Sequence, residues 1–142
     1  MSAYLDASAL VPTLVDEPAS AIMVAFIEQY SVTLVVSEFA AAEVSSALSR
    51  LVRTGTMTAD EAKARLIAFD AWRRTGSEPA DIRASDIRLA NTYVRRFDLM
   101  LRAPDALHAA VCRRLDLTLV TSDRRLATAA REFGVNVIVP AA

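Results

Sequence analysis

The sequence predicts an α/β domain in which about seven helices flank a central, mostly parallel β-sheet of four to five strands. Short apolar runs of strand type alternate along the chain with longer segments of helical spacing, and this alternation is typical of βαβ units. Several of the short runs are rich in β-branched residues, as expected for buried parallel strands. With 142 residues, 54% of them hydrophobic, the chain can form one substantial core, so we expect a single domain over residues 1–142.

The first expected strand is "AYLDA" at residues 3–7. Three further β-branched runs lie between helical segments: "VTLVV" at 32–36, "LTLVT" at 117–121 and "VNVIV" at 135–139. A fifth, short strand is expected near residues 80–83, after the loop-like stretch "RTGSEPAD" at 74–81. The strands are therefore distributed along the whole chain, as a sheet with helical crossovers requires.

Segments of helical spacing fill the intervals, and helices are expected at 8–15, 18–29, 37–54, 58–74, 84–97, 104–115 and 123–133. Several carry start or stop signals. Thr58 fits the N-cap of a capping box in "TADE". Pro18 and Pro104 fit the first helical position, where the missing N–H costs nothing. Gly55 and Gly134 follow the ends of two helices, as C-cap glycines do.

Several kinds of site lack the residues that they need. Three glycines, at 55, 76 and 134, cannot form a dinucleotide-binding fingerprint or a phosphate-binding loop. A catalytic triad would depend on His108, the single histidine, and no G-x-S-x-G motif accompanies it. His108 and Cys112 are too few for a zinc site. We expect Cys112 to be a small buried thiol and His108 to be a packed residue or one that supports a ligand.

Membrane insertion and export are not supported by the sequence. The stretch "PASAIMVAFI" at 18–27 is shorter than the roughly 18 apolar residues that a membrane-spanning helix needs. The N-terminal residues lack the basic region, apolar run and small-residue cleavage site of a secretory signal. We therefore expect a cytoplasmic protein that does not associate with a membrane.

The net charge is only −1, yet 15 of the 16 basic residues are arginine. Eight of these arginines form adjacent pairs, at 73/74, 95/96, 113/114 and 124/125. Arginine is suited to bidentate contacts with phosphate, so a local patch that binds nucleic acid is compatible with the overall charge. The alternative is that the pairs lie on solvated helix faces.

Four acidic residues lie where an α/β sheet gathers its ligands. Asp6 ends the first strand and Asp123 follows "TLVTS", so both carboxylates are expected at the carboxyl edge of a parallel sheet. Glu43 borders an apolar stripe in "SEFAAAEVSSALSRL", and a half-buried carboxylate there needs a partner. Asp105 follows Pro104 in the first turn of a helix, where backbone N–H groups favour negative charge.

Each acid alone also has a structural explanation. Asp6 and Asp123 fit N-caps, Asp105 fits a first-turn residue, and Glu43 fits an exposed helix edge. If the four converge, two carboxylates about 4 Å apart repel by roughly 4 kcal/mol, so the cluster needs protons or a cation. A hard divalent ion such as Mg²⁺ or Mn²⁺ accepts oxygen ligands, and acids combined with arginine pairs indicate phosphodiester hydrolysis.

Four stretches carry a family resemblance: "YLDASALV", "SEFAAAEVSSALSR", "LRAPDALHAA" and "LTLVTSDRRLATAA". They occur in the order and approximate spacing found in PIN-domain ribonucleases. Each motif is weak alone, but four in order over nearly the whole chain are specific. The chain resembles a VapC toxin of a type II toxin–antitoxin (VapBC) system.

The resemblance implies an acidic site that binds Mg²⁺ (or Mn²⁺) and catalyses RNA hydrolysis, formed by Asp6, Glu43, Asp105 and Asp123. Asp6 and Asp105 are implied as the most direct metal contacts, whereas Asp123 could act through water or on a second ion. Ser8 and Thr121 match small hydroxyl positions near the site that orient a ligand or water. Arginines near the pocket would position the RNA backbone, and the candidates are Arg102, Arg124 and Arg125.

The resemblance also implies partners. They are an RNA substrate, a cognate VapB-like antitoxin that blocks the acidic pocket, and a second copy in a homodimer, with DNA contacted only through the antitoxin. Apolar residues in the expected helix 18–29 and Trp72 offer surface for such a partner, or alternatively belong to the core.

Two other classes stay open. A haloacid-dehalogenase-like phosphatase also opens with an Asp after a strand, but its motif has a second Asp where this chain has Ser8. A non-catalytic PIN-like binding domain would use the acids to recognise basic peptides. Loss of one or more acids would favour that class, and all four are present.

Overall fold

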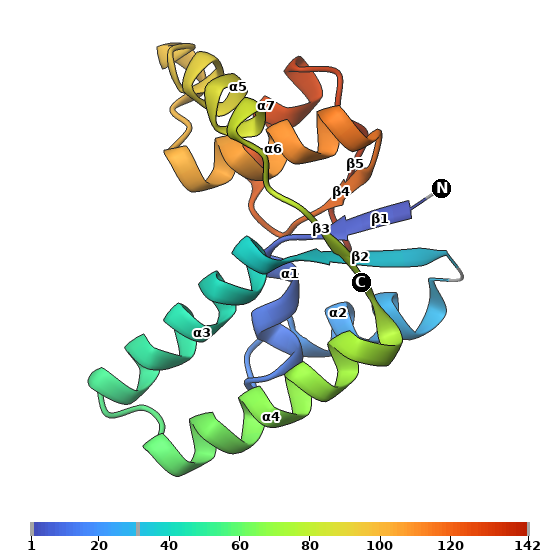
Figure 1. Cartoon of the computed structure of the whole chain (residues 1–142). Helices are drawn as coiled ribbons and strands as arrows, with labels where there is room; N and C mark the ends of the chain where they lie inside the picture. The colour runs from blue at the N-terminus through green and yellow to red at the C-terminus, as the bar shows by residue number, and fades with distance from the viewer. Residues whose placement is uncertain (1, 31, 142) are drawn as a thin grey trace.

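A five-stranded parallel sheet forms the centre of the computed structural model, which describes residues 2–30 and 32–141 (Figure 1). The strands are β1 (Ser2–Leu5), β2 (Thr33–Ser37), β3 (Glu78–Ala80), β4 (Thr118–Val120) and β5 (Val137–Ile138). Their order across the sheet is β3-β2-β1-β4-β5, and each neighbouring pair is parallel. The predicted α/β class with a mostly parallel sheet is confirmed, and all the described pairings are parallel.

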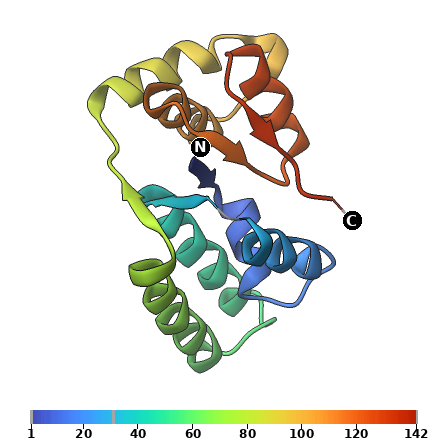
Figure 2. The ribbon, with the colours of Figure 1, turned by 90° about the vertical axis from the view of Figure 1, so that its right-hand side faces the viewer.

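Helices cover both faces of the sheet. They are α1 (Ala7–Leu10), α2 (Ser20–Gln29), α3 (Glu38–Arg53), α4 (Ala59–Gly76), α5 (Ala84–Val94), α6 (Ala103–Leu115) and α7 (Arg124–Glu132), with 3₁₀ turns η1 (Val11–Thr13) and η2 (Phe97–Leu99). Figure 2 shows α1–α4 on one face and α5–α7 on the other. Alternate strand side chains enter the two cores: Tyr4 packs with the α5–α7 layer, whereas Ala3 and Leu5 pack with α1–α4.

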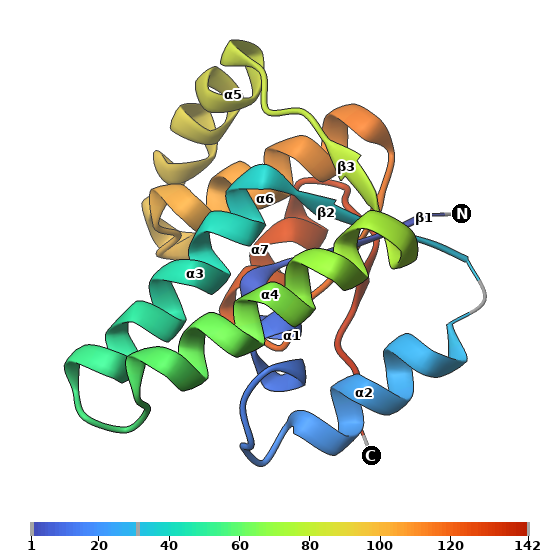
Figure 3. The same cartoon turned by 60° about the horizontal axis from the view of Figure 1, so that its bottom comes forward.

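The antiparallel pair α3 and α4 extends away from the sheet (Figures 1 and 3). Its connection uses two of the predicted signals. Gly55 has φ +78°, a backbone conformation that residues with a side chain rarely adopt. Thr58 is the N-cap of α4, and its hydroxyl accepts a hydrogen bond from the Glu61 N–H at 3.1 Å. Gly134, with φ +79°, likewise follows α7. No helix among the described residues is long and apolar enough to cross a membrane.

Most predicted boundaries agree within one or two residues, and the differences have local causes. The expected helix 8–15 is split into α1 and η1, because Pro12 lacks the N–H that would continue the α-helix. Pro18 lies outside α2, where the Ser20 hydroxyl accepts the Glu17 N–H at 2.9 Å. Pro104 is the second rather than the first residue of α6, which begins at Ala103. The prediction for both prolines was therefore wrong in detail.

Two further predictions were wrong. The expected strand near residues 80–83 lies at Glu78–Ala80, inside the stretch interpreted as a loop, because α4 continues to Gly76. The expected helix 84–97 ends at Val94 and is followed by the 3₁₀ turn η2. Met100, which ends that turn, has φ +53°, a left-handed conformation in which a helix cannot continue.

Candidate active site

The carboxyl edge of β1 and β4 brings the first and last acidic motifs together. The two strands pair in parallel with Leu5 opposite Val120, and the Asp6 N–H donates to the Val120 carbonyl at 3.3 Å. Asp123 follows three residues after Val120, at the start of α7. The expected meeting of these two motifs at one sheet edge is therefore observed in the fold.

Asp6 is held rigidly at this edge. Its side chain is almost fully buried, and Oδ1 accepts hydrogen bonds from the Ser8 hydroxyl at 2.7 Å and the Ala9 N–H at 3.1 Å. Oδ2 accepts from the Thr121 hydroxyl at 2.6 Å. Burial raises the pKa of Asp6, and the hydrogen bonds from Thr121 and Ser8 oppose that rise. Asp6 is thus both the N-cap of α1 and a carboxylate fixed in orientation.

Thr121 links Asp6 to Asp123. Its hydroxyl donates to Asp6 and accepts the Asp123 N–H at 3.0 Å. Asp123 is the N-cap of α7, and its Oδ1 accepts from the N–H groups of Arg125 and Leu126 at 3.0 and 3.1 Å. The Asp123 hydrogen bonds among the described residues involve Oδ1, which leaves Oδ2 for other contacts.

Asp105 lies close enough to Asp123 and Asp6 for both carboxylates to affect its pKa. It lies half-buried in the first turn of α6. Burial raises its pKa, and the nearby carboxylates of Asp123 and Asp6 raise it further, while Arg102 opposes the rise. The protonation of Asp105 therefore depends on the charges of Asp6 and Asp123.

Glu43 belongs to a different set of contacts. Its side chain is 28% exposed, and Oε1 is hydrogen bonded to Nε2 of His108. The imidazole is 2% exposed, and its Nδ1 lies 2.6 Å from the Tyr4 hydroxyl. The prediction that Glu43 is half buried and needs a partner is confirmed, and that partner is His108. Both ring nitrogens are occupied in this way, so His108 does not pair with its sequence neighbour Asp105.

Two residues near Glu43 and His108 were not predicted from the sequence, Tyr4 and Ser37. Tyr4 is fully buried, and its hydroxyl lies 2.7 Å from the Ser37 hydroxyl. The available signal was a phenol two residues before Asp6 on a buried strand, because a buried hydroxyl needs a partner. Ser8 and Thr121 were singled out as orienting a ligand or water, but in the structure both hydroxyls donate to Asp6.

The donor set of the three carboxylates fits a hard divalent cation. No three Asp, Glu, His or Cys side chains within the described part of the chain are grouped closely enough to enclose a metal ion by themselves. Mg²⁺ is commonly held through one or two carboxylates and retains several waters, so it does not need such a cage. Burial is the main cause of the raised pKa of Asp105 and repulsion from Asp123 and Asp6 adds to it; a bound divalent cation would relieve that repulsion.

Both members of the arginine pairs 95/96 and 124/125 are exposed, as the structural alternative predicted, whereas Arg73 and Arg114 are partly buried. Arg73, Arg96 and Arg114 each form an ion pair with a carboxylate, at 2.9, 2.8 and 2.7 Å. The other members of the four pairs are exposed. The three arginines named as candidate RNA contacts, Arg102, Arg124 and Arg125, are also exposed, in the segments that begin α6 and α7.

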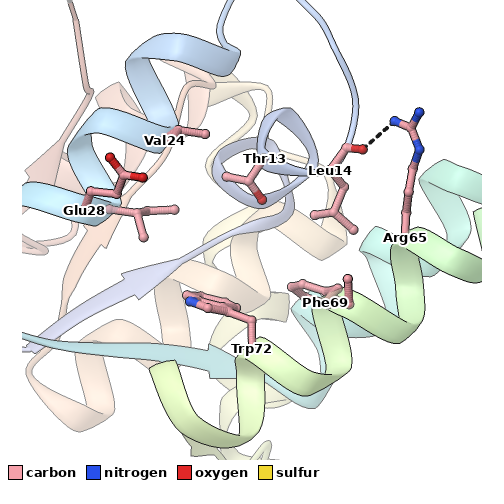
Figure 4. A pocket seen from close by; sticks show the side chains of 9 residues that line it. Thr13, Leu14, Val24, Glu28, Arg65, Phe69 and Trp72 are labelled. Carbon is pink, nitrogen blue, oxygen red and sulfur yellow. Dashed lines mark hydrogen bonds between the residues drawn. The ribbon is translucent and has the colours of Figure 1, made fainter.

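Two other predicted features lie away from the acids. Cys112 is 1% exposed, which confirms a buried thiol, and burial raises its pKa. Trp72 of α4 and Val24 of α2 line a largely apolar pocket of about 460 Å³ (Figure 4). Arg65 borders this pocket and donates to the Leu14 carbonyl at 2.6 Å. Part of the apolar surface predicted around helix 18–29 and Trp72 therefore remains open rather than filled by the core.

Comparison with known proteins agrees with this architecture. The profile of the PIN domain matches residues 3–132. No curated protein matches the chain. Several solved structures share its fold.

The structure of VapC20 from Mycobacterium tuberculosis, described as a sarcin-ricin loop cleaving toxin, is 17% identical over 89% of this chain and 94% of that chain, with a TM-score of 0.71. FitAcB from Neisseria gonorrhoeae is 18% identical over 97% of each chain, with a TM-score of 0.69. VapBC2 from Rickettsia felis, bound to a DNA fragment from their promoter, is 15% identical over 97% of this chain and 98% of that chain, with a TM-score of 0.68. At these identities the likeness establishes the fold. Together with the profile match, it shows that the chain belongs to the PIN domain family.

Proposed function

We propose that this protein is a Mg²⁺-dependent endoribonuclease, a toxin of the VapC kind that is neutralised by a cognate VapB-like antitoxin. The proposal is supported by the link between Asp6 and Asp123 through the Thr121 hydroxyl at the end of β1 and β4, and by the effect of both carboxylates on the pKa of Asp105. Family membership supports it, because PIN domains are typically nucleases that use a divalent metal. The family match also leaves the phosphatase alternative without support.

Asp6 and Asp105 are the residues that would hold the ion, Mg²⁺ or Mn²⁺, with Glu43 and Asp123 completing the site. When bound, such an ion supplies Lewis-acid stabilisation of the negative charge that develops on a phosphodiester during hydrolysis. The chain itself supplies orientation. Asp6 is fixed by two hydroxyl groups and a backbone N–H, so its carboxylate needs little reorganisation on binding.

The remaining residues act on the RNA and the attacking water. In this proposal Glu43 and Asp123 would orient the water that attacks the phosphorus in line. Arg102, Arg124 and Arg125 are exposed beside the acids, where they position the phosphate backbone. Phosphate contacts of this kind position the substrate but do not select a sequence.

The proposal is tested by incubating RNA with the wild-type protein, Asp6→Asn and Asp105→Asn in Mg²⁺ or in EDTA. We expect cleavage only by wild type with Mg²⁺, and a loss of at least about a hundredfold in each variant. Asp98→Asn is the matched control, because Asp98 is an exposed acid on η2 that pairs with Arg96. Cleavage that survives both substitutions and the chelator would defeat the mechanism.

We further propose a homodimer and an antitoxin partner, with DNA contacted only through the antitoxin. The support is that the similar structures include the VapBC2 complex on promoter DNA and FitAB bound to a DNA fragment. The apolar pocket between α2 and α4 offers surface for the antitoxin (Figure 4). Trp72, the only tryptophan, lines this pocket, so its fluorescence should change when the antitoxin binds and stay unchanged if the antitoxin binds elsewhere.

A further inference from the structure

A buried chain of hydrogen bonds runs from the start of α3 through the sheet to Glu43. The Ser37 hydroxyl lies 2.7 Å from the Tyr4 hydroxyl, which lies 2.6 Å from Nδ1 of His108. Nε2 of His108 is hydrogen bonded to Oε1 of Glu43. Ser37 and Tyr4 are fully buried, His108 is 2% exposed and Glu43 is 28% exposed, so the chain leads from the core to the edge of the acidic site.

With a neutral imidazole, the donors and acceptors along this series of hydrogen bonds fit one direction. The Ala40 N–H donates to Ser37 Oγ at 3.0 Å, which leaves the Ser37 hydroxyl free to donate to Tyr4. A phenol is protonated at neutral pH, so the Tyr4 hydroxyl donates to Nδ1 of His108. A neutral imidazole then carries its proton on Nε2 and donates it to Glu43. In this arrangement each hydroxyl and ring nitrogen from Ser37 to His108 has a partner, as does Oε1 of Glu43.

The chain also connects the elements that carry the other acids. Tyr4 lies two residues before Asp6 on the same segment, and His108 lies one helical turn after Asp105 on α6. The imidazole therefore joins Glu43 to the segments that carry Asp6 and Asp105.

We infer that His108, oriented by Tyr4, is a positioning residue that holds Oε1 of Glu43 through an Nε2–H donor and so leaves Oε2 available to the acidic site. This inference rests on the proposed function, in which Glu43 completes the metal site. Hydrogen-bond partners behind metal ligands typically change metal affinity or activity by about 10- to 100-fold when they are removed.

A purely structural role would be served by the ring alone. His108 packs between Tyr4 and Phe39, with ring centroids 5.5 and 5.4 Å away, and any residue of similar size would fill that space. The positioning role instead requires an N–H at the place of Nε2. Two amide substitutions separate these roles, because a glutamine amide reaches the place of Nε2 and an asparagine amide reaches only that of Nδ1.

The first experiment measures Mn²⁺ affinity by isothermal titration calorimetry for wild type, His108→Gln and His108→Asn, with thermal denaturation as the check of folding. We expect His108→Asn to lose about tenfold or more in affinity and His108→Gln to keep most of it. Equal Mn²⁺ affinity in wild type and His108→Asn would overturn the positioning role of His108 and leave the proposed function standing. If wild type neither binds Mn²⁺ nor cleaves RNA, the proposed function fails instead.

A second measurement does not depend on the stability of any His108 variant. The chain has a single histidine, so imidazole ¹⁵N signals of the wild-type protein belong to His108 without further assignment. We expect Nε2 to carry a proton and Nδ1 to be an acceptor, and we expect the Nε2–H signal to move in Glu43→Gln. An unprotonated Nε2, or an Nε2–H signal that is unchanged in Glu43→Gln, would overturn the inference.

Discussion

At the carboxyl edge of the sheet, two carboxylates each cap a helix and also affect the pKa of a neighbouring acid. Asp6 caps α1 and Asp123 caps α7, yet both also raise the pKa of Asp105. The capping explanation and the site explanation of these residues therefore do not exclude each other. A helix N-terminus stabilises one carboxylate through its N–H groups, but it does not remove the repulsion between neighbouring carboxylates.

The raised pKa of Asp105 predicts that its contribution to the free energy of unfolding falls as the pH rises. Its pKa in the folded protein is raised above the usual 3.8, so the folded state binds this proton more tightly than the unfolded state. That contribution to stability is complete at low pH and is lost as the pH rises through the folded pKa. In metal-free protein, Asp105→Asn should therefore raise the free energy of unfolding by about 1 kcal/mol near neutral pH and change it little near pH 3.

Urea denaturation in EDTA at the two pH values measures this difference. Asp98→Asn is the control, because the exposed Arg96–Asp98 pair should contribute little to stability at either pH. An Asp105→Asn variant that is equally stabilised at both pH values, or destabilised near neutral pH, would contradict the account.

The reactivity of the Cys112 thiol measures how well this part of α6 is buried. Its side chain is 1% exposed and burial raises the pKa of its thiol, so both access and ionisation oppose reaction. We expect a thiol reagent to label the native protein at least about a thousandfold more slowly than the urea-unfolded chain, because labelling requires opening of the core. Rapid labelling under native conditions would show that this part of α6 is open.

At the scale of elements, a buried ion pair holds α5 against α6. Asp86 is 1% exposed in its side chain, and its two oxygens accept from Nε and an Nη atom of Arg114 at 2.7 and 2.9 Å. The Arg83 N–H also donates to Asp86 at 2.8 Å. This contact fixes the C-terminal part of α6, the helix that carries Asp105 and His108 near its start.

Breaking this pair should destabilise the whole fold. Asp86→Ala leaves Arg114 without its partner and removes the hydrogen bond at the start of α5, and we expect a loss of about 3 kcal/mol in the free energy of unfolding. Arg114 lowers the pKa of Asp86, so this stabilisation is present above the usual carboxyl pKa and is lost as the pH falls through the folded value.

Denaturation curves of Asp86→Ala and Asp98→Ala form the matched comparison. The Arg96–Asp98 pair is exposed on both sides, so its loss should have little effect. Equal stability of the two variants would show that the α5–α6 pair does not hold these helices together.

The boundaries of elements show what local patterns miss. Apolar periodicity identifies α3, α6 and α7 within one residue at each end. These ends are predictable because capping residues lie within one turn of the helix terminus. It fails at Pro12, which ends α1 early, and at β3, whose three residues contain a proline and are recognisable only through their pairing with β2. Both errors concern backbone hydrogen bonds whose partners are set by the tertiary fold, so the local sequence does not predict them.

For the whole molecule, topology explains what the sequence could predict about the site. Asp6 and Asp123 follow strands, and parallel neighbouring strands bring their ends to one edge, so their approach was predictable. The contact between Glu43 and His108 was not, because it joins residues 65 positions apart on helices from opposite faces of the sheet. The hydrogen bonds from Ser37 and Tyr4 likewise need the tertiary fold.

The account as a whole depends on a cation at the acidic site, so a direct Mn²⁺ titration of the metal-free protein by calorimetry is its most direct test. The account predicts saturable binding by wild type and by the Asp98→Asn control, and affinity at least about tenfold weaker in Asp105→Asn. Absence of binding by wild type, or equal binding by wild type and Asp105→Asn, would contradict it.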